Sequence, residues 1–255
     1  MESNTQALLE FALDAAQQAG RITLGYFQSD LQVERKADNT PLTIADKQAE
    51  QKLRDLITAN YPDHAIMGEE FGKTDQDSKY TWILDPIDGT KSFVAGVPLY
   101  ATLIALLDGD EALLGVAHFP ALGETLYAVR GAGCFCNGRR VHVSKVDQLK
   151  DAVLLVSGLN YFGLKEAAWQ RLVKATYIQR TWGDAYGYYL IATGRAEIML
   201  DPAMALWDAG PLQVIMEEAG GTFTDWKGNA TIHGWESIAT NGVLFRQVMA
   251  LIGQN

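Results

Sequence analysis

Cysteine is scarce in this sequence, which contains two cysteines among 255 residues. Cys134 and Cys136 are separated by one residue, too short a spacing for a disulfide that would close a long loop. No second cysteine pair completes a structural zinc site, and the four histidines lie far apart in the chain. We therefore expect the two cysteines to pack in a glycine-rich hairpin and the protein to reside in the reducing cytoplasm.

Basic residues and long apolar runs are also scarce. Lysine and arginine number 21 against 31 aspartates and glutamates, and the formal net charge of -10 has the wrong sign for binding nucleic-acid phosphates. No apolar run approaches the roughly 20 residues that cross a bilayer, and the opening residues MESNTQALLE match neither a secretory signal nor a transit peptide. We expect neither a nucleic-acid polymer nor a membrane as a partner.

The remaining composition, 48% hydrophobic and 20% charged, is typical of a globular chain that forms one large domain or two small ones. Apolar residues at three- and four-residue spacing predict a long helix that starts near Asn4 or Thr5 and extends through Tyr26. Thr43 and Asp46 stand in the relation of a capping box, which predicts a second helix directly after them.

Residues 65–126 change to short apolar runs separated by glycine and aspartate, a pattern that predicts an antiparallel meander. After about residue 145, apolar strand-like runs alternate with helical patterns. We expect those helices at about residues 167–175, 185–193 and 209–219. This change of pattern suggests two subdomains, residues 1–145 and residues 146–255.

Three carboxylates follow or end apolar runs in the first half of the chain. Asp85 ends the strand-like run in WILDPIDGTKSF, Asp88 follows three residues later, and Glu69 stands just past another short run in GEE. Parallel or neighbouring strands would bring all three to one sheet edge. Such a cluster is tolerable when cations neutralise it, and oxygen ligands at a turn suit Mg²⁺. We expect a magnesium site there.

A phosphate site would adjoin the metal. Gly89 and Thr90 form a turn that enters a helix, and the free N–H groups of such a turn hold phosphate oxygens. Asp208, in WDAG, stands at a helix start and can cap that helix or coordinate a metal.

Each acid also has a purely structural interpretation. Asp88 alone is an ordinary turn residue, Asp208 an ordinary N-cap, Asp46 a capping-box acid and Glu70 a solvated neighbour of Glu69. The occurrence of GEE, DPIDGT and WDAG in one chain favours the functional interpretation.

These segments also resemble a known family. GEE at 68–70, WILDPIDGTKSF at 82–93 and WDAGPLQVIMEEAGG at 207–221 closely resemble the signature regions of the inositol monophosphatase family, and the resemblance spans essentially the whole chain. It implies an α+β fold, a five-layer α/β/α/β/α sandwich, usually as a homodimer. It also implies hydrolysis of a small phosphomonoester by a metal-activated water, without a covalent phosphoenzyme and often with sensitivity to Li⁺.

The resemblance assigns metal ligands residue by residue. One Mg²⁺ would lie on Glu69, Asp85 and the carbonyl oxygen of Ile87, and a second on Asp85, Asp88 and Asp208. A third ion, held mostly by water near Glu69, would bring the number to two or three ions per site.

The resemblance also assigns catalytic and phosphate-binding roles. Thr90 and Glu69 would orient and deprotonate the attacking water, so that Glu69, Asp85, Asp88 and Thr90 form the catalytic set. The N–H groups of Gly89 and Thr90 would hold the phosphate.

Departures from the inositol enzymes concern the substrate. Inositol phosphatases usually read DGTTNF, whereas Lys91 and Ser92 give DGTKSF, a form found in histidinol phosphatases and in the 3'-nucleotidase branch. Asp184 and Asp201 stand where inositol enzymes carry a small residue and a glutamate. Both acids would suit the ammonium and imidazole of L-histidinol phosphate. The resemblance therefore favours a histidinol-phosphatase of histidine biosynthesis.

Alternatives stay open for several of these residues. Asp184 is equally suited to cap the helix that follows it, Lys91 is either solvated or adds charge near the phosphate, and Trp182 and Tyr186 either stack on an imidazole or pack. The alternative functions are an inositol-1-phosphate phosphatase, a broad sugar or nucleotide phosphatase of the 3'(2'),5'-bisphosphate nucleotidase type, and an inactive metal- or phosphoester-binding protein.

Overall fold

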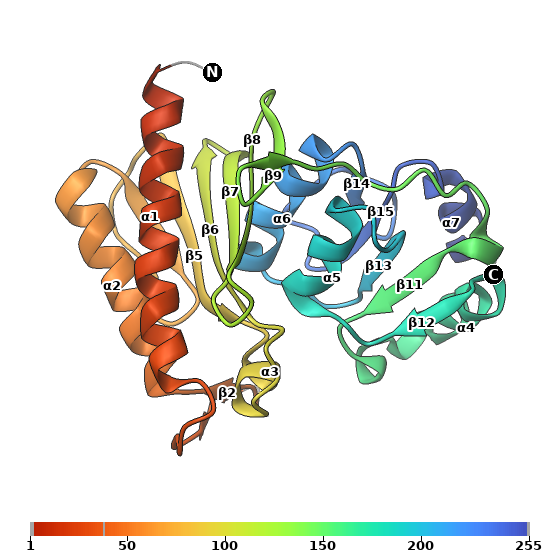
Figure 1. Cartoon of the computed structure of the whole chain (residues 1–255), viewed down its shortest axis with the longest axis horizontal. Helices are drawn as coiled ribbons and strands as arrows, with labels where there is room; N and C mark the ends of the chain where they lie inside the picture. The colour runs from red at the N-terminus through yellow and green to blue at the C-terminus, as the bar shows by residue number, and fades with distance from the viewer. Residues whose placement is uncertain (1–2, 38, 254–255) are drawn as a thin grey trace.

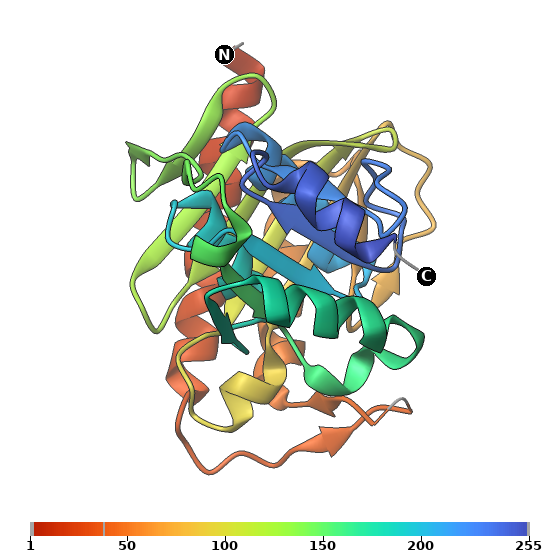
Figure 2. The same cartoon turned by 90° about the vertical axis from the view of Figure 1, so that its right-hand side faces the viewer.

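The chain folds into five alternating layers of helix and sheet in the computed structural model, which describes residues 3–37 and 39–253 (Figure 1). The described helices are α1 (Ser3–Tyr26), α2 (Ile44–Asn60), α3 (Thr90–Val94), α4 (Glu166–Ala175), α5 (Asp184–Ala192), α6 (Leu206–Glu218) and α7 (Phe245–Ile252). Helices α1 and α2 cover the outer face of the larger sheet, and α5 and α6 lie between the two sheets. Helices α4 and α7 lie side by side on the outer face of the smaller sheet (Figure 2). This arrangement confirms the expected α+β sandwich.

Within residues 3–37 and 39–253, the larger sheet has eight strands and the smaller sheet five. In spatial order, the larger sheet consists of β10 (Arg139–Arg140), β9 (Gly133–Cys136), β8 (Glu124–Val129), β7 (Glu111–Phe119), β6 (Ala101–Asp108), β5 (Tyr80–Asp88), β3 (Ala65–Gly68) and β4 (Gly72–Lys73). The smaller sheet consists of β12 (Ile178–Arg180), β11 (Val153–Val156), β13 (Ile198–Asp201), β15 (Ser237–Thr240) and β14 (Thr222–Thr224). Strands β1 (Glu34–Arg35) and β2 (Pro41–Leu42) form a separate hairpin.

Strands β3 and β5 are parallel, and this pairing positions the site. Strands β5 to β8 form the antiparallel meander that the sequence predicts, and β9 and β10 continue it beyond the predicted segment. The prediction is wrong for the first strand of the segment, since Gly68 of β3 lies opposite Leu84 of β5 in a parallel register. The short strand β4 turns the chain back, so β5 starts at the same end of the sheet as β3. Both strands therefore end at one edge.

The two N-terminal helices follow their sequence patterns. Thr43 is the N-cap of α2, and the Asp46 carboxylate accepts its backbone N–H at 2.7 Å, which confirms the predicted capping box. Helix α1 begins at Ser3 within the described residues, so the expected caps Asn4 and Thr5 lie inside its first turn. No helix of the described ranges is long and apolar enough to cross a membrane.

Helix α6 lies unusually close to the larger sheet. A Cβ atom at Gly115 of β7 would stand 2.4 Å from the carbonyl oxygen of Pro211, and one at Gly210 would stand 3.4 Å from the Cβ of Ala105. The missing side chains allow the helix backbone to approach the sheet. This approach brings the first turn of α6, with Asp208, towards the end of β5.

The strands of the two sheets come from different halves of the chain, the larger sheet ending at Arg140 and the smaller beginning at Val153. Helix α6, from the second half, nevertheless packs on β5, β6, β7 and β8. The two halves share a hydrophobic core that includes Ile83 and Leu212. The proposed subdomains 1–145 and 146–255 stay a prediction.

Candidate metal and phosphate site

The parallel ends of β3 and β5 place two acids of the motifs next to each other in the fold. Glu69 follows β3 directly, and its backbone N–H donates to the carbonyl oxygen of Leu84 at 3.1 Å. Leu84 immediately precedes Asp85 in β5. The backbone of Glu69 is therefore fixed to the strand that carries Asp85.

A bulge in β5 turns the chain between its two aspartates. The register with β6 shifts between Asp85 and Asp88, and the Asp85 carboxylate accepts the N–H of Ile87 at 2.9 Å inside the bulge. The hydroxyl of Thr102 in β6 donates to the carbonyl oxygen of Pro86 at 2.9 Å. Both ends of the bulge are held, as is common for a bulge that aims side chains into a site.

Helix α6 supplies the third carboxylate of the cluster. Asp208 is the third residue of α6, not its N-cap, and its carboxylate accepts the N–H of Ala205 at 2.9 Å. One carboxylate oxygen from each of Asp85, Asp88 and Asp208 lies within 4.8 Å of the others. In the part of the chain that the structure describes, these three form the only such group of potential metal ligands.

Asp85 and Asp88 are buried, Asp208 is partly exposed, and the charges of the three acids repel one another. Burial raises the pKa of Asp85 well above its usual range, and the charges of Glu69 and Asp208 raise it further. Burial does the same to the pKa of Asp88, with Asp184 and Asp208 adding to the shift. Burial also raises the pKa of Asp208 to about 7.

No cation in the described part of the chain forms an ion pair with this cluster. Among the ion pairs of the described residues, none involves Asp85, Asp88 or Asp208. Converging carboxylates are the donor set that Mg²⁺ prefers, and a divalent cation would offset their repulsion. The residues present therefore fit the metal that the motifs imply.

Glu69 is paired differently, with a lysine from the β1–β2 hairpin region. The Lys36 ammonium donates to Glu69 at 2.7 Å and to Glu70 at 2.8 Å. Burial lowers the pKa of Lys36, but the two hydrogen-bonded carboxylates raise it more, so the ammonium stays charged. The expectation that Glu70 is solvated is wrong, because its side chain is 5% exposed and burial raises its pKa to about 7.

Asp88, Gly89 and Thr90 form the predicted turn into a helix, and we call these three residues the phosphate turn. Gly89 has a φ of 77° and is the N-cap of the one-turn helix α3. The Thr90 hydroxyl donates to the carbonyl oxygen of Ile87 at 3.0 Å. First-turn N–H groups have no partner within their helix, so this turn offers donors to an anion.

Asp184 lies against the phosphate turn and does not cap its own helix. The N-cap of α5 is Gly183, and the Asp88 carboxylate accepts the N–H of Ala185 at 2.7 Å. A Cβ atom at Gly89 would stand 3.1 Å from a carboxylate oxygen of Asp184. Asp184 has a φ of 53°, a left-handed conformation that is rare outside glycine. The capping interpretation of Asp184 is therefore wrong.

Asp184 and Asp201 are both in surroundings that favour the protonated acid. Burial raises the pKa of Asp184 to about 6, and the charge of Lys91 limits the rise. Burial raises the pKa of Asp201 to about 8, although hydrogen bonds from Ser157 and Tyr188 oppose it. The Tyr188 hydroxyl donates to Asp201 at 2.8 Å. A cation placed near these two acids would favour their ionised forms.

The other residues near the phosphate turn divide between contact and packing roles. The Lys91 ammonium contacts the Tyr161 hydroxyl and lies 4.9 Å from the centre of its ring, so it is not simply solvated. Tyr186 packs against the rings of Phe119 and Tyr189, which favours its packing role. Trp182 is 44% exposed.

The sequence did not indicate that Asp46 lies near Glu69. It is fully buried, and one of its carboxylate oxygens has no hydrogen-bond partner. Burial raises the pKa of Asp46 to about 6, and the charge of Glu69 adds to the rise. Its capping box with Thr43 explained the residue from sequence alone, so its nearness to Glu69 had no separate signal.

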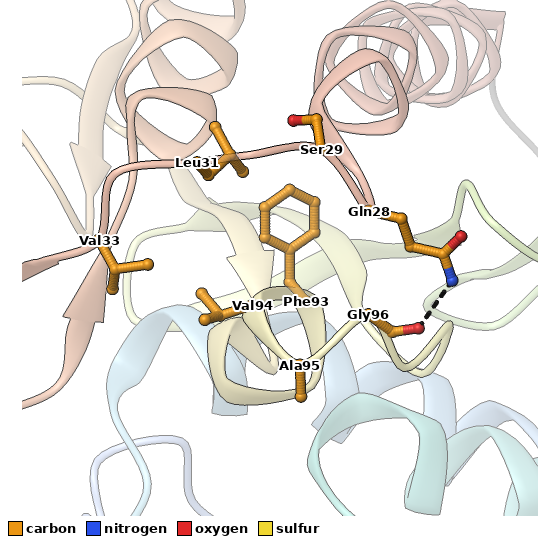
Figure 3. A pocket seen from close by; sticks show the side chains of 8 residues that line it. All are labelled: Gln28, Ser29, Leu31, Val33, Phe93, Val94, Ala95 and Gly96. Atoms are coloured by element: carbon orange, nitrogen blue, oxygen red, sulfur yellow. Dashed lines mark hydrogen bonds between the residues drawn. The ribbon is translucent and has the colours of Figure 1, made fainter.

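A hollow of about 370 Å³ lies beside α3, away from the acids (Figure 3). Gln28, Ser29, Leu31 and Val33 line one side and residues 93–96 the other, with the Phe93 ring between them. The Gln28 amide donates to the carbonyl oxygen of Gly96 at 3.0 Å across the hollow. None of the lining side chains ionises, so we place the chemistry at the acidic cluster.

Known proteins are similar to this chain in sequence and in fold. The model of the inositol monophosphatase family matches residues 4–254. A protein of Chlorobaculum parvum named histidinol-phosphatase is 41% identical over 250 residues, which cover 96% of each chain. A protein of the same name from Mycobacterium tuberculosis is 36% identical over 263 residues, which cover 97% of each chain.

Solved structures agree with the sequence comparison. The extragenic suppressor protein suhB from Bartonella henselae matches with a TM-score of 0.92 and 27% identity, covering 98% of this chain and 99% of that one. The Thermotoga maritima IMPase matches with a TM-score of 0.89 and 31% identity, covering 96% of each chain. The chain therefore belongs to the inositol monophosphatase family, as its motifs indicate.

Proposed function

We propose that this phosphoric monoester hydrolase uses Mg²⁺ to hydrolyse L-histidinol phosphate to L-histidinol, a step of histidine biosynthesis. The observation that supports this choice of substrate is the place of the Asp184 carboxylate, which lies against the phosphate turn and caps no helix. L-Histidinol phosphate has an ammonium and an imidazole that can be cationic, whereas an inositol phosphate offers hydroxyls beyond its phosphate. The names of the two histidinol-phosphatase relatives support the same choice.

The donor set supports a site for two Mg²⁺ ions. We assign Glu69, Asp85 and the Ile87 carbonyl oxygen to one ion, and Asp85, Asp88 and Asp208 to the other, with a third ion near Glu69. The three aspartates, each with a carboxylate oxygen within 4.8 Å of the others, support the second of these sites. When bound, Mg²⁺ would supply the positive charge that activates water and stabilises the phosphate and the leaving oxygen.

The protein itself binds and orients the reactants. The N–H groups of Gly89 and Thr90 donate to the phosphate oxygens from the first turn of α3. The Thr90 hydroxyl, which donates to the Ile87 carbonyl oxygen, accepts a hydrogen bond from the attacking water and orients it, and the Glu69 carboxylate takes the proton of that water. Asp184 and Asp201 hold the cationic end of the substrate, and that cation favours the ionised form of both acids. Positioning and charge supply most of what phosphoryl transfer requires.

We further propose a cytoplasmic homodimer. The family resemblance of the sequence supports the dimer. Cys134 and Cys136 are both free and buried in β9, as expected for a reducing compartment. The elution volume and scattered light of the purified protein would give its mass, and a monomer at micromolar concentration would contradict the dimer.

Phosphate release tests the function. We would measure it with L-histidinol phosphate, myo-inositol 1-phosphate and adenosine 3',5'-bisphosphate, each with and without Mg²⁺. We expect Mg²⁺-dependent turnover with the highest kcat/KM for L-histidinol phosphate. Turnover without Mg²⁺, or none with any substrate, would refute the mechanism.

The variant Asp184→Asn tests the substrate. Loss of one charged contact should raise the KM for L-histidinol phosphate about ten-fold, since about 1.4 kcal/mol of binding corresponds to a factor of ten. The KM for myo-inositol 1-phosphate is the control and should change little. An unchanged KM for L-histidinol phosphate would remove Asp184 from the substrate site.

A further inference from the structure

We propose that Glu50 is a positioning residue, which fixes the metal ligand Glu69 by binding the backbone of the turn that carries it. The proposal rests on the metal site proposed above. Glu50 belongs to α2 and lies one helical turn after Asp46. It is 0% exposed. Nothing in the sequence marked it, since it stands in an ordinary helical pattern 19 residues before Glu69.

The turn that carries Glu69 is short, and all three of its N–H groups have partners. The turn consists of Glu69, Glu70 and Phe71 and connects β3 to β4. Gly68, the last residue of β3, pairs across it with Gly72, the first residue of β4. The first N–H, of Glu69, donates to β5 at the carbonyl oxygen of Leu84. The other two donate to the carboxylate of Glu50, from Glu70 at 2.7 Å and from Phe71 at 3.2 Å. One side chain therefore satisfies two-thirds of the turn's donors.

Arg54, on the same face of α2, also binds this turn, and we call Glu50 and Arg54 together the clamp. The Arg54 guanidinium donates to Glu50 at 2.8 Å and also contacts the carbonyl oxygen of Gly72 at the far end of the turn. It lies 5.8 Å from the centre of the Phe71 ring. A buried carboxylate is costly unless it is paired and hydrogen-bonded, and these contacts meet that condition. Glu50 and Arg54 together hold the turn from one side.

Gly68, the glycine of the GEE motif, is explained by the same clamp. Its φ is not positive, so its backbone does not require glycine. A Cβ atom at Gly68 would stand 2.1 Å from a carboxylate oxygen of Glu50 and 2.4 Å from its Cδ atom. The glycine therefore leaves the space that the Glu50 carboxylate occupies. Any larger residue would displace either the carboxylate or the turn.

This arrangement predicts an effect on metal affinity. Glu50 touches the backbone on the C-terminal side of Glu69, while β5 holds the N–H of Glu69 itself. Loss of the Glu50 contacts leaves the turn free to move, so the Glu69 carboxylate is less often in its binding position. Groups that orient metal ligands typically change metal affinity or activity by about 10- to 100-fold when mutated.

The test is Mg²⁺ binding to the metal-free full chain, measured by calorimetry without substrate. For Glu50→Gln we expect at least one Mg²⁺ to bind about ten-fold more weakly than in the wild type. We also expect a matching increase in the Mg²⁺ concentration for half-maximal turnover, with kcat largely restored at saturating Mg²⁺. Asp55→Asn is the control, because it removes one carboxylate from the same helix at an exposed position whose contact is to Gln51. It should bind Mg²⁺ like the wild type.

A merely structural role gives a different result. It would lower the thermal midpoint of Glu50→Gln, followed by circular dichroism, and leave the Mg²⁺ affinity unchanged, which would overturn the proposal. If Glu50→Gln does not fold, Arg54→Met serves in its place, since it removes the cation and the Gly72 contact but keeps the Glu50 acceptors. We expect it to weaken Mg²⁺ binding about three-fold, and unchanged affinity would overturn the proposal.

A double substitution adds an independent check. Gly68→Ala should weaken Mg²⁺ binding in the wild type, but should have little further effect in a Glu50→Ala background, where the space is free. Equal effects in both backgrounds would contradict the explanation of Gly68. If the wild type itself binds no Mg²⁺, the proposed function fails. If wild type and variants bind equally, only the role of Glu50 fails.

Discussion

Asp88 links the acidic cluster to α5 through two contacts. Its carboxylate lies with those of Asp85 and Asp208, and it accepts the N–H of Ala185 at the start of α5. A carboxylate at a helix N-terminus is stabilised by the partial positive charge there. Asp88 therefore connects the phosphate turn of the larger sheet to the helix that begins with Asp184.

We predict that Asp88→Asn loses turnover but keeps its fold. The amide oxygen of asparagine can still accept the N–H of Ala185, whereas the charge that would bind Mg²⁺ is gone. We expect kcat to fall at least 100-fold while the thermal midpoint in EDTA stays the same or rises, because one repelling charge leaves the cluster. Near-normal activity would remove Asp88 from the metal site.

Single residues differ in how far the sequence reveals them. Asp85 and Asp208 stand at element ends inside long motifs, so their positions could be predicted. Lys36 and Glu50 act on the GEE turn from 33 and 20 residues away, through contacts that only the packing of α2 and the β1–β2 hairpin creates. The left-handed backbone of Asp184, which decides against its capping role, has no sequence signal either.

At the scale of elements, the site depends on how closely α6 approaches the larger sheet. Gly115 in β7 faces the backbone of Pro211, one turn after Asp208 in α6. The two nearest atoms, the carbonyl oxygen and the Cα of Pro211, belong to the helix backbone, so they cannot move aside locally, and Cγ1 of Val214 follows at 2.8 Å. Added volume at Gly115 must displace the helix and, with it, the Asp208 carboxylate.

We predict that Gly115→Ala destabilises the protein by about 1 to 3 kcal/mol, the usual cost of overpacking a well-packed core. Gly115 has no positive φ, so the cost is steric and not conformational. Urea unfolding gives the change in the free energy of unfolding. Gly109→Ala is not a suitable control, because Gly109 has a φ of 62° and alanine would be strained there. Ala112→Gly, in the same strand, is the control, because it gives the change in the free energy of unfolding for a substitution that does not overpack the core. A free energy within 0.5 kcal/mol of the wild type at Gly115→Ala would contradict the close approach.

Elements were predictable where their periodicity was strong and local. The helices at α1, α2, α4 and α5 follow their patterns closely, but α6 begins at Leu206, three residues before the expected start, so Asp208 lies inside its first turn. The sequence left open whether β3 and β5 pair in parallel. The direction of this pairing depends on the small strand β4, which has two residues and no periodicity.

At the scale of the whole molecule, part of the acidic excess behind the net charge of -10 has a specific location. Several acids meet between the two sheets. Burial raises the pKa of Asp184 to about 6, and burial together with repulsion from neighbouring acids raises the pKa of Asp208 to about 7 and of Asp201 to about 8. Without metal, these groups hold protons in the folded protein that the unfolded chain releases near pH 4. Protonation and Mg²⁺ are thus alternative ways to relieve the same repulsion.

This alternative predicts how the stability of the metal-free protein depends on pH. Because the folded pKa of Asp201 is raised from 3.8 to about 8, the folded state binds more protons between these values, and the contribution to stability is present below pH 4 and lost as pH rises towards 8. One such group changes the free energy of unfolding by at most about 1.4 kcal/mol per pH unit. Urea unfolding in EDTA from pH 5 to pH 8 should therefore show a shallower loss for Asp201→Asn than for the wild type. The difference between the two proteins cancels the histidine titrations that they share, so parallel pH profiles would mean that Asp201 is ionised in the folded protein without a metal.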